Sequence, residues 1–164
     1  MPNWTKSCVT LMYSAAVALG AIVVFAGAVY GVTARQQIGV LAPASVIVDG
    51  KPVSLYEGRV FIYFFDPECM HCYAGAQQMS KYAWKGGVKV IAVPTVNPKW
   101  AEGFLRDTGL KASIAKDPKA LREVFSFTDP PYAVALENGR QVQALPFFDE
   151  KEPVTALRKL GWVE

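Results

Sequence analysis

Two cysteines and the chain's only histidine lie within four residues, in the segment Cys69-Met70-His71-Cys72. An apolar run over 60–65 precedes them, Asp66-Pro67-Glu68 predicts a turn, and a helix-compatible stretch follows. This order predicts that the first cysteine lies at a helix N-terminus, where unpaired amides and the helix dipole stabilise a thiolate. The second cysteine falls one turn further on, close enough to close a disulfide. The spacing therefore predicts a dithiol redox site.

Other uses of two closely spaced cysteines fit the sequence less well. Covalent haem attachment needs a histidine directly after the second cysteine, where Tyr73 stands. A structural zinc site needs four ligands, and the only other cysteine is Cys8. A copper(I) site made of the two thiols with Met70 or Met79 stays open, because soft sulfur ligands suit that ion. A pair of inert, buried cysteines is the remaining alternative, and the histidine in the same turn argues against it.

The neighbours of the first cysteine predict opposing effects on the redox balance. His71 could stabilise the Cys69 thiolate by hydrogen bonding or by its charge. A Glu68 carboxylate would disfavour that thiolate and favour the disulfide. Glu68 could instead accept the proton of Cys72. Asp66 is interpreted as a turn or N-cap residue.

The N-terminal part of the chain differs in composition from the rest. Residues 8–32 form a run of 25 positions without a charged side chain, which can cross a hydrocarbon core of about 30 Å as a helix. We therefore predict a short tail over 1–7, an uncleaved transmembrane signal anchor over 8–32, a linker over 33–45 and one domain over 46–164. A cleaved signal peptide is the alternative, because small residues stand near its end.

The remainder of the chain is almost neutral. From residue 36 onward it carries 15 basic and 14 acidic residues, which gives no reason to expect nucleic acid or an anionic surface as a partner. Lys6 before the apolar run and Arg35 after it do not decide its orientation. Lasting disulfide exchange belongs outside the cytosol. We therefore expect a single pass through the cytoplasmic (inner) membrane, with the catalytic domain on the periplasmic or extracytoplasmic side.

The hydrophobic pattern of the domain predicts alternating strands and helices. The 60–65 and 89–93 runs are apolar on both faces, which predicts central parallel strands covered by helices. The pairs Asp49-Gly50 and Asn138-Gly139 predict tight turns. Strands are expected at 46–48, 53–55, 60–65, 89–93, 132–136 and 141–144. Helices are expected at 73–84, from Asn97-Pro98 to 108, from Asp117-Pro118 to 125, and from a capping box at Asp149 and Glu152 to 160.

In this order the elements describe a thioredoxin fold, and three stretches resemble membrane-anchored thioredoxin-like proteins of the TlpA/ResA type. They are residues 49–55, residues 60–72 with the CxxC motif, and residues 131–139, which begin where thioredoxins have a cis-proline. The resemblance covers about residues 45–164. It implies an α/β fold with a central mixed sheet flanked by helices, preceded here by the one N-terminal transmembrane helix.

The resemblance also implies roles for individual residues. Cys69 would be the exposed nucleophile and Cys72 the resolving thiol, with a Cys69–Cys72 disulfide as the oxidised form. A cis-proline next to the CxxC motif would expose backbone groups to an extended substrate. The residues expected to contact substrate are Met70, Pro130, Pro131 and Tyr132, with Trp84 and Trp100 as further candidates for a groove.

Several positions depart from the thioredoxin pattern. Glu68 stands where thioredoxins usually carry an aromatic residue, and Tyr63 stands where they carry a carboxylate six residues before the first cysteine. The residue before the expected cis-proline is itself a proline, Pro130, and no proline lies between the cysteines. A histidine at position 71 resembles instead the periplasmic oxidases of the DsbA kind.

We expect from these observations a membrane-tethered thiol–disulfide oxidoreductase that exchanges disulfides with protein substrates, narrowly favoured as a reductant. No cofactor is implied, and electrons would pass to or from a membrane or soluble redox partner. The alternatives are a copper(I)-binding or assembly protein that uses the same cysteines, a DsbA-like oxidant, or a structural subunit of a membrane complex. A peroxidase is disfavoured, because the threonine that peroxiredoxins carry four residues before their reactive cysteine is absent.

Overall fold

The computed structural model describes residues 38–164 except residues 128 and 147. The predicted tail, the predicted transmembrane anchor and the first five residues of the predicted linker lie outside the described residues. Among the helices of the described part, none has the length and apolar content needed to cross a bilayer.

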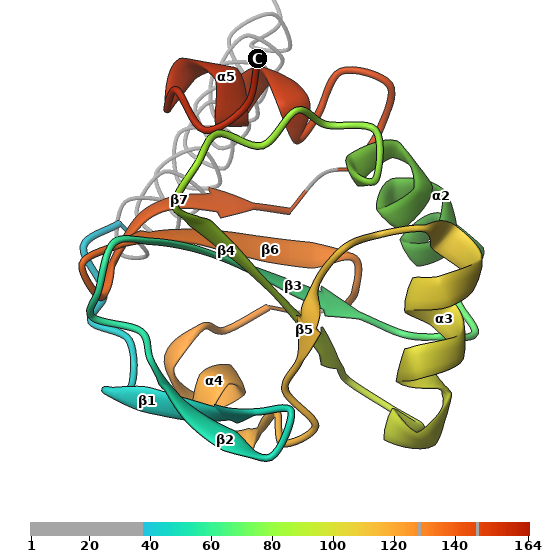
Figure 1. Ribbon diagram of the computed structural model, residues 1–164, viewed down its shortest axis with the longest axis horizontal. Coiled ribbons are helices and arrows are strands. Elements are labelled where there is room, and N and C mark those ends of the chain that lie inside the picture. The colour runs from blue at the N-terminus through green and yellow to red at the C-terminus, as the bar shows by residue number, and fades with distance from the viewer. Residues whose placement is uncertain (1–37, 128, 147) are drawn as a thin grey trace, which may run out of the picture. The chain divides into compact units, whose positions relative to one another are not determined.

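The described chain forms two short strands, then alternating strands and helices, and finally a hairpin and a helix (Figure 1). The strands are β1 Ser45–Val48, β2 Lys51–Ser54, β3 Arg59–Phe65, β4 Val88–Pro94, β5 Ser113–Ile114, β6 Tyr132–Glu137 and β7 Arg140–Leu145. The helices are α2 Met70–Met79, the 3₁₀ turn η1 Pro98–Trp100, α3 Ala101–Thr108, α4 Lys119–Val124 and α5 Val154–Lys159.

Five strands form one mixed sheet in the order β5-β4-β3-β6-β7, while β1 and β2 form a separate antiparallel pair. The strands β3, β4 and β5 are parallel, and β6 and β7 are antiparallel to their neighbours. The predicted parallel pairing of the two apolar runs is confirmed, and so is the hairpin at Asn138-Gly139. Strand β5 was not predicted, because a two-residue strand leaves no period in the sequence.

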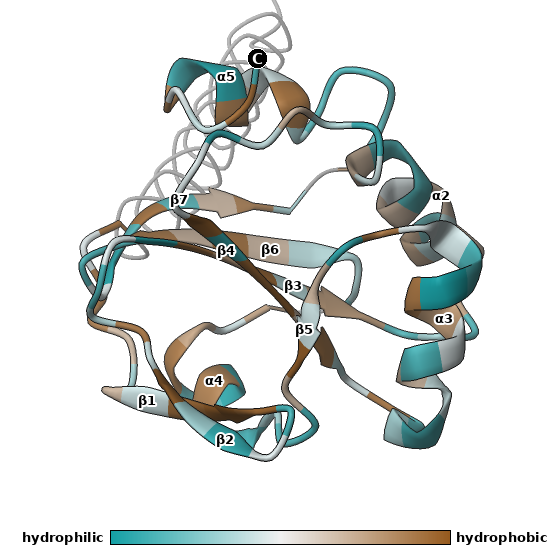
Figure 2. Ribbon diagram, viewed as in Figure 1, coloured by the Kyte–Doolittle hydropathy of each residue, from teal (hydrophilic) through white to brown (hydrophobic). Residues whose placement is uncertain are grey.

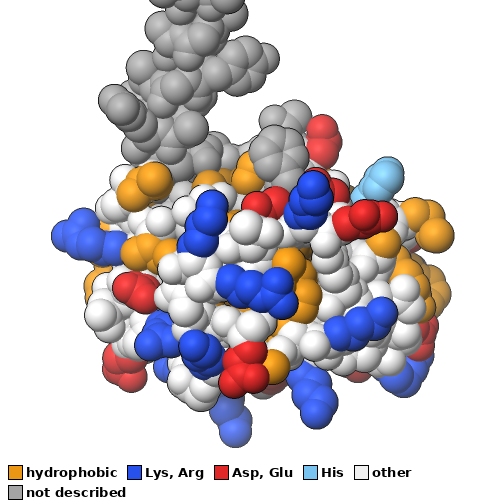
Figure 3. All heavy atoms as spheres, turned by 90° about the horizontal axis from the view of Figure 1, so that it is seen from above, with side chains coloured by type: hydrophobic (Ala, Val, Ile, Leu, Met, Phe, Trp, Pro, Cys, Tyr) orange, Lys and Arg blue, Asp and Glu red, His pale blue; other side chains and the backbone are white. Residues whose placement is uncertain are grey.

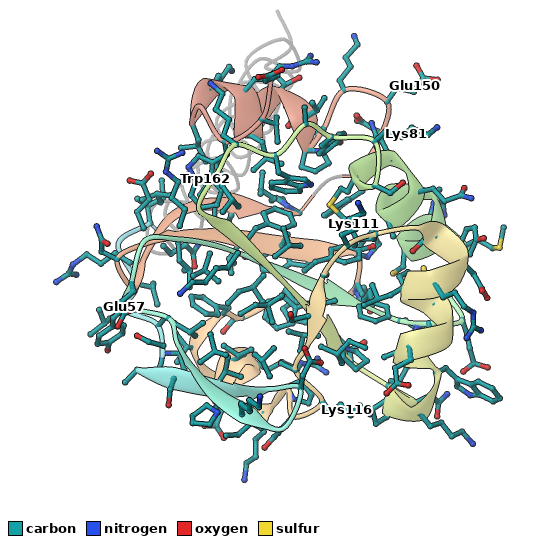
Figure 4. The ribbon with its side chains drawn as sticks, in the orientation of Figure 1. Glu57, Lys81, Lys111, Lys116, Glu150 and Trp162 are labelled. Atoms are coloured by element: carbon teal, nitrogen blue, oxygen red, sulfur yellow. The ribbon has the colours of Figure 1, made fainter. Side chains whose placement is uncertain are left out.

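The central strand β3 is buried on both faces. Phe61, Tyr63 and Phe65 point into a core formed with α2, α3 and α5. The alternate side chains, which start at Val60, point into a second core formed with the β1–β2 pair and α4. Because both faces are covered, every residue of the strand from Val60 to Phe65 is buried. Figure 2 shows brown, hydrophobic segments along the central strands β3 and β4. In Figure 4 the side chains of sheet and helices fill the interior, with Trp162 among them.

Helix α2 is shorter than its predicted extent to residue 84. It ends at Met79, and the following backbone pairs with the C-terminus instead. The Lys85 N–H donates to the Trp162 carbonyl over 2.9 Å, and Trp84 forms a bridge with Val163. The Trp84 ring lies 5.1 Å from the Phe61 ring, so the apolar residues that suggested a longer helix pack on the sheet.

Two predicted helix starts also differ from the structure. Asn97 does not cap a helix with its side chain; it has a left-handed backbone (φ 45°), and a 3₁₀ turn separates it from α3. Helix α5 begins at Val154, two residues after Glu152. The Asp149 Oδ1 accepts from the Glu152 N–H as in a capping box, but the Glu152 carboxylate turns forward to the Ala156 N–H.

Both outer strands of the sheet have another part of the chain lying against them. Residues 39–42 pair with the start of β7: the Gly39 N–H donates to the Gln141 carbonyl over 2.7 Å, and Leu41 forms a bridge with Arg140. These residues, predicted as linker, thus belong to the folded unit. At the opposite edge, Asp49 donates its N–H to the Ile114 carbonyl and accepts the Ile114 N–H at its Oδ1.

Gly139 gives a test of the hairpin geometry. It has φ 79°, and a Cβ at this position would clash with the Tyr56 ring, whose hydroxyl donates to the Ala42 carbonyl. We expect Gly139→Ala to lower the free energy of unfolding by about 2–3 kcal/mol, from left-handed strain and displacement of Tyr56. Gly50→Ala, with φ 78° and open space around it, should lose only about 1 kcal/mol. Urea unfolding of both variants measures the difference, and equal losses would contradict the packing argument.

Candidate active site

The CxxC segment begins where β3 leaves the sheet. The Thr95 N–H donates to the Phe65 carbonyl over 2.8 Å, which ties the ends of β3 and β4 together. In the turn that follows, Asp66 Oδ1 accepts from the Glu68 N–H over 2.9 Å, and the Asp66 carbonyl accepts from the Cys69 N–H. The interpretation of Asp66 as a turn residue is confirmed. The N-cap of α2 is Cys69 itself, with an extended backbone (φ −89°, ψ 120°).

The Cys69 sulfur is partly exposed and lies at the helix N-terminus. Its Sγ accepts a hydrogen bond from the Cys72 N–H at 3.4 Å, one of the amides that has no partner inside the helix. A donor placed in this way stabilises a thiolate. Both cysteines are free thiols in this structure.

The Cys72 sulfur, in contrast, is fully buried. Its Sγ accepts from the Asp66 N–H at 3.4 Å. Burial is the main cause that raises the pKa of the Cys72 thiol to about 12. The Asp66 N–H opposes this shift, and the neighbouring Cys69 and the Asp66 charge reinforce it. The two thiols of the motif therefore differ strongly in access to solvent.

Tyr63 lies beneath the motif with 0% of its surface exposed. Its hydroxyl donates to the Cys72 carbonyl over 2.8 Å, and its ring packs against Phe65 and Phe148. Burial, with the nearby charges of the two cysteines, raises the pKa of Tyr63 well above its usual range. At this position the chain therefore has a permanent hydrogen-bond donor that fixes the first turn of α2, in place of a carboxylate.

Glu68 is exposed and is held by a residue that the sequence did not indicate. Its carboxylate accepts a hydrogen bond from the Asn97 side-chain amide, which comes from the loop after β4. The pair Asn97-Pro98 was interpreted as a helix start, because a sequence gives no signal for a contact across 29 residues. His71 and Met70 are exposed on the first turn of α2, with Met70 at 78%. Figure 3 shows the single histidine side chain standing out from the surface.

The predicted substrate-contact residues divide into two groups. The Pro130–Pro131 peptide bond is cis, and both prolines are partly exposed. Strand register pairs Phe64 with Tyr132, which brings Pro131 to the sheet end where β3 leads into the CxxC turn. The Tyr132 side chain, however, is only 5% exposed and stacks on Phe127 at 4.9 Å. The Tyr132 side chain is therefore not available to a substrate.

A groove of about 310 Å³ adjoins the CxxC turn. Trp100, 54% exposed, lies at its side, whereas Trp84 packs on the sheet. The lining residues are Pro67, Glu68, Tyr73, Trp100, Gly103, Phe104, Arg106 and Asp107.

The two methionines proposed as ligands for copper(I) differ in exposure. Met79 is fully buried at the end of α2, while Met70 is 78% exposed. Within residues 38–164, apart from 128 and 147, no group of three or more His, Cys, Asp or Glu side chains is placed to hold a metal ion.

A mixed five-stranded sheet flanked by helices, with a CxxC motif opening the helix after its central strand, defines a thioredoxin fold. The chain is similar to a candidate protein disulfide isomerase from Bacteroides thetaiotaomicron, with TM-score 0.63 and 20% identity over 76% of this chain and 88% of that chain. It is similar to a candidate thiol:disulfide interchange protein DsbE from Chlorobium tepidum, with TM-score 0.59 and 18% identity over 76% and 96%.

Peroxiredoxin Q from Xanthomonas campestris has TM-score 0.60 and 16% identity over 76% of this chain and 97% of that chain. No family model matches the sequence, and no curated protein matches it. At such identities these likenesses establish the fold, and the activity has to be argued from the site.

The asymmetry of the two thiols predicts selective alkylation. In the reduced protein at about pH 7, iodoacetamide should modify Cys69 at least about tenfold faster than Cys72, because only Cys69 is accessible and next to a helix N-terminus. Raising the pH toward 12 should bring Cys72 into reaction as its thiol ionises. Peptide mass spectrometry after timed quenching measures both rates. Equal rates at neutral pH would contradict the burial of Cys72.

Proposed function

We propose that this protein is a thiol–disulfide oxidoreductase that exchanges disulfides with protein substrates through Cys69. The observation that carries the proposal is the contrast between the two sulfurs. Cys69 is partly exposed and receives a helix amide, whereas Cys72 is buried one turn away. In exchange through a pair of thiols, the substrate must reach the first sulfur. The second sulfur must reach the first in order to resolve the mixed disulfide.

The proposed reaction, in the reducing direction, has two steps. The Cys69 thiolate attacks a substrate disulfide, forms a mixed disulfide and releases one substrate sulfur as a thiolate. Cys72 then gives up its proton and attacks the Cys69 sulfur. The substrate leaves with both of its sulfurs reduced. The protein has given up two electrons and now contains a Cys69–Cys72 disulfide. A redox partner must then reduce this disulfide before the next cycle.

The reducing direction is supported by the charges around the motif. Two carboxylates, Asp66 and Glu68, lie in the turn before Cys69, against one imidazole, His71. Carboxylates near a thiolate disfavour it and thereby favour the disulfide form, which makes the pair a better reductant. The hydrogen bond from Asn97 keeps the Glu68 carboxylate in this turn.

We also propose that the domain is tethered to the cytoplasmic membrane and faces the extracytoplasmic side, where a membrane redox partner would reduce it. The support is the uncharged run over 8–32, together with disulfide chemistry that belongs outside the cytosol. The full chain should stay with the membrane fraction after alkaline carbonate washing. Release into the wash would contradict the tether.

The reduction potential tests the direction of the reaction. Equilibration of the full chain with glutathione or dithiothreitol, followed by trapping of Cys69 and Cys72, should give a value near −270 mV, which is typical of thioredoxin. Glu68→Gln should raise the potential, because it removes a charge that disfavours the thiolate. A value near −120 mV would instead make the protein an oxidant.

Trapping of the mixed disulfide tests the proposed roles. With Cys8→Ser in both variants, Cys72→Ala should accumulate dithiothreitol-sensitive adducts with a disulfide-bonded protein substrate, and Cys69→Ala should form none. If neither variant forms adducts and the wild type forms no reversible disulfide, the oxidoreductase proposal fails. Retention of copper(I) by the reduced protein, and its loss in Cys69→Ala, would then favour the metal-binding alternative.

A further inference from the structure

The buried thiol of Cys72 needs a proton acceptor for the second step of exchange. Only a thiolate attacks a disulfide, and this sulfur is shielded from water. Burial raises the pKa of Cys72 to about 12, so at neutral pH almost all of it is protonated. A group close to the sulfur must therefore take the proton as the attack begins.

Two nearby groups are poorly suited to this task. Tyr63, the titratable side chain that packs from β3, is fully buried and already uses its hydroxyl to donate to the Cys72 carbonyl. Glu68, which the sequence had suggested as the acceptor, is exposed and bound to Asn97 on the loop after β4. Cys69 itself is bonded to the substrate at this stage and cannot accept the proton.

Asp66 satisfies the requirement better than either. Its backbone N–H already contacts the Cys72 sulfur at 3.4 Å, and its side chain is half-buried at the end of β3. The Glu68 N–H holds its Oδ1 in place over 2.9 Å. The charge of the Asp66 carboxylate acts on the Cys72 thiol and raises its pKa. One residue thus combines a backbone donor to the developing thiolate with a carboxylate whose charge acts on the Cys72 thiol.

We propose that Asp66 is the catalytic residue that accepts the Cys72 proton during resolution of the mixed disulfide. This inference rests on the proposed oxidoreductase function. As the proton passes to the Asp66 carboxylate, the Cys72 sulfur uses its electron pair to bond to the Cys69 sulfur. The Cys69–substrate bond breaks, and its electron pair leaves with the substrate as a thiolate. That thiolate takes up a proton from Asp66 or from water, so charge and electrons balance.

The test follows both thiols with one reagent. Reaction of the reduced full chain with 5,5′-dithiobis(2-nitrobenzoate) should release one coloured thiolate when Cys69 attacks and a second when Cys72 displaces the group from Cys69. Cys8→Ser is included in every variant, so that only the motif reacts. Stopped-flow absorbance separates the two phases. If the wild type released no second coloured thiolate, the proposed oxidoreductase function itself would be overturned. A second release that does not depend on Asp66 would overturn only the proposed role of Asp66.

The decisive variant is Asp66→Asn, which keeps an oxygen for the Glu68 N–H. We expect its second phase to be slowed about 100-fold or more near pH 7, because a positioned general base typically contributes at least this much. The first phase should not be slowed, because the carboxylate that is removed disfavours the Cys69 thiolate. A faster second phase in this variant would overturn the proposal. The Asp66 charge raises the pKa of Cys72. If the carboxylate acted only through this charge, its removal would lower the pKa and speed the attack by Cys72. An unchanged second phase would also overturn it.

Asp117→Asn is the matched control. Asp117 precedes a proline in the same way, and its Oδ1 accepts from the Lys119 N–H over 3.0 Å, but it lies before α4. Its variant should have wild-type rates in both phases, so a general weakening of such turns is excluded.

The pH dependence of the second-phase rate in the wild type is a test that does not require any variant to fold. With Asp66 as acceptor, the second phase should be nearly constant from about pH 6 to 9, because the attack then does not depend on the fraction of Cys72 that is already ionised. Without an internal acceptor, the rate should follow the Cys72 thiolate and rise about tenfold per pH unit. A tenfold rise per unit in the wild type would overturn the proposal.

Discussion

The hydrogen bond from the Tyr63 hydroxyl to the Cys72 carbonyl joins the central strand to the helix that carries both thiols. It lies in the core, where an unpaired carbonyl is costly, so the first turn of α2 is held at a fixed position above β3. The burial of Cys72, the position of Cys69 as N-cap and the approach of Asp66 to the second sulfur all depend on this position. A tyrosine can supply such a bond because its hydroxyl is protonated at neutral pH, and burial raises its pKa further.

A consequence is that positioning and proton transfer belong to different residues in this protein. A buried carboxylate beneath the motif could serve as a base but would be charged in a dry interior. Tyr63 is uncharged in that interior. The carboxylate proposed as base is instead that of Asp66, which lies half-buried in the turn and accepts a hydrogen bond from the Glu68 N–H. The cost of burying an ion is thereby avoided without removing acidic groups from the neighbourhood of the thiols.

Much of the fold and the main features of the site could be predicted from the sequence, because short stretches of neighbouring residues determine them. The apolar runs of β3 and β4, the Asn138-Gly139 turn and the CxxC spacing each lie within a few residues. Contacts between distant segments could not be predicted. The Asn97–Glu68 bond, the pairing of 83–85 with the C-terminus and the strand β5 depend on how the finished sheet brings segments together. The side chain of Tyr132 was expected at a surface, and its burial follows from the second core on the far side of the sheet.

The coverage of the outer strands matters for a protein that would handle partly folded chains. Unpaired strand edges are templates on which extended polypeptides add by backbone pairing. Here residues 39–42 lie against the start of β7, and the Asp49 turn pairs with Ile114 of β5. These contacts shorten the free edges on which an extended chain could add as a further strand. Under the proposed function, binding of an extended client would then be left to other surfaces, among them the end of the molecule where Cys69 is partly exposed.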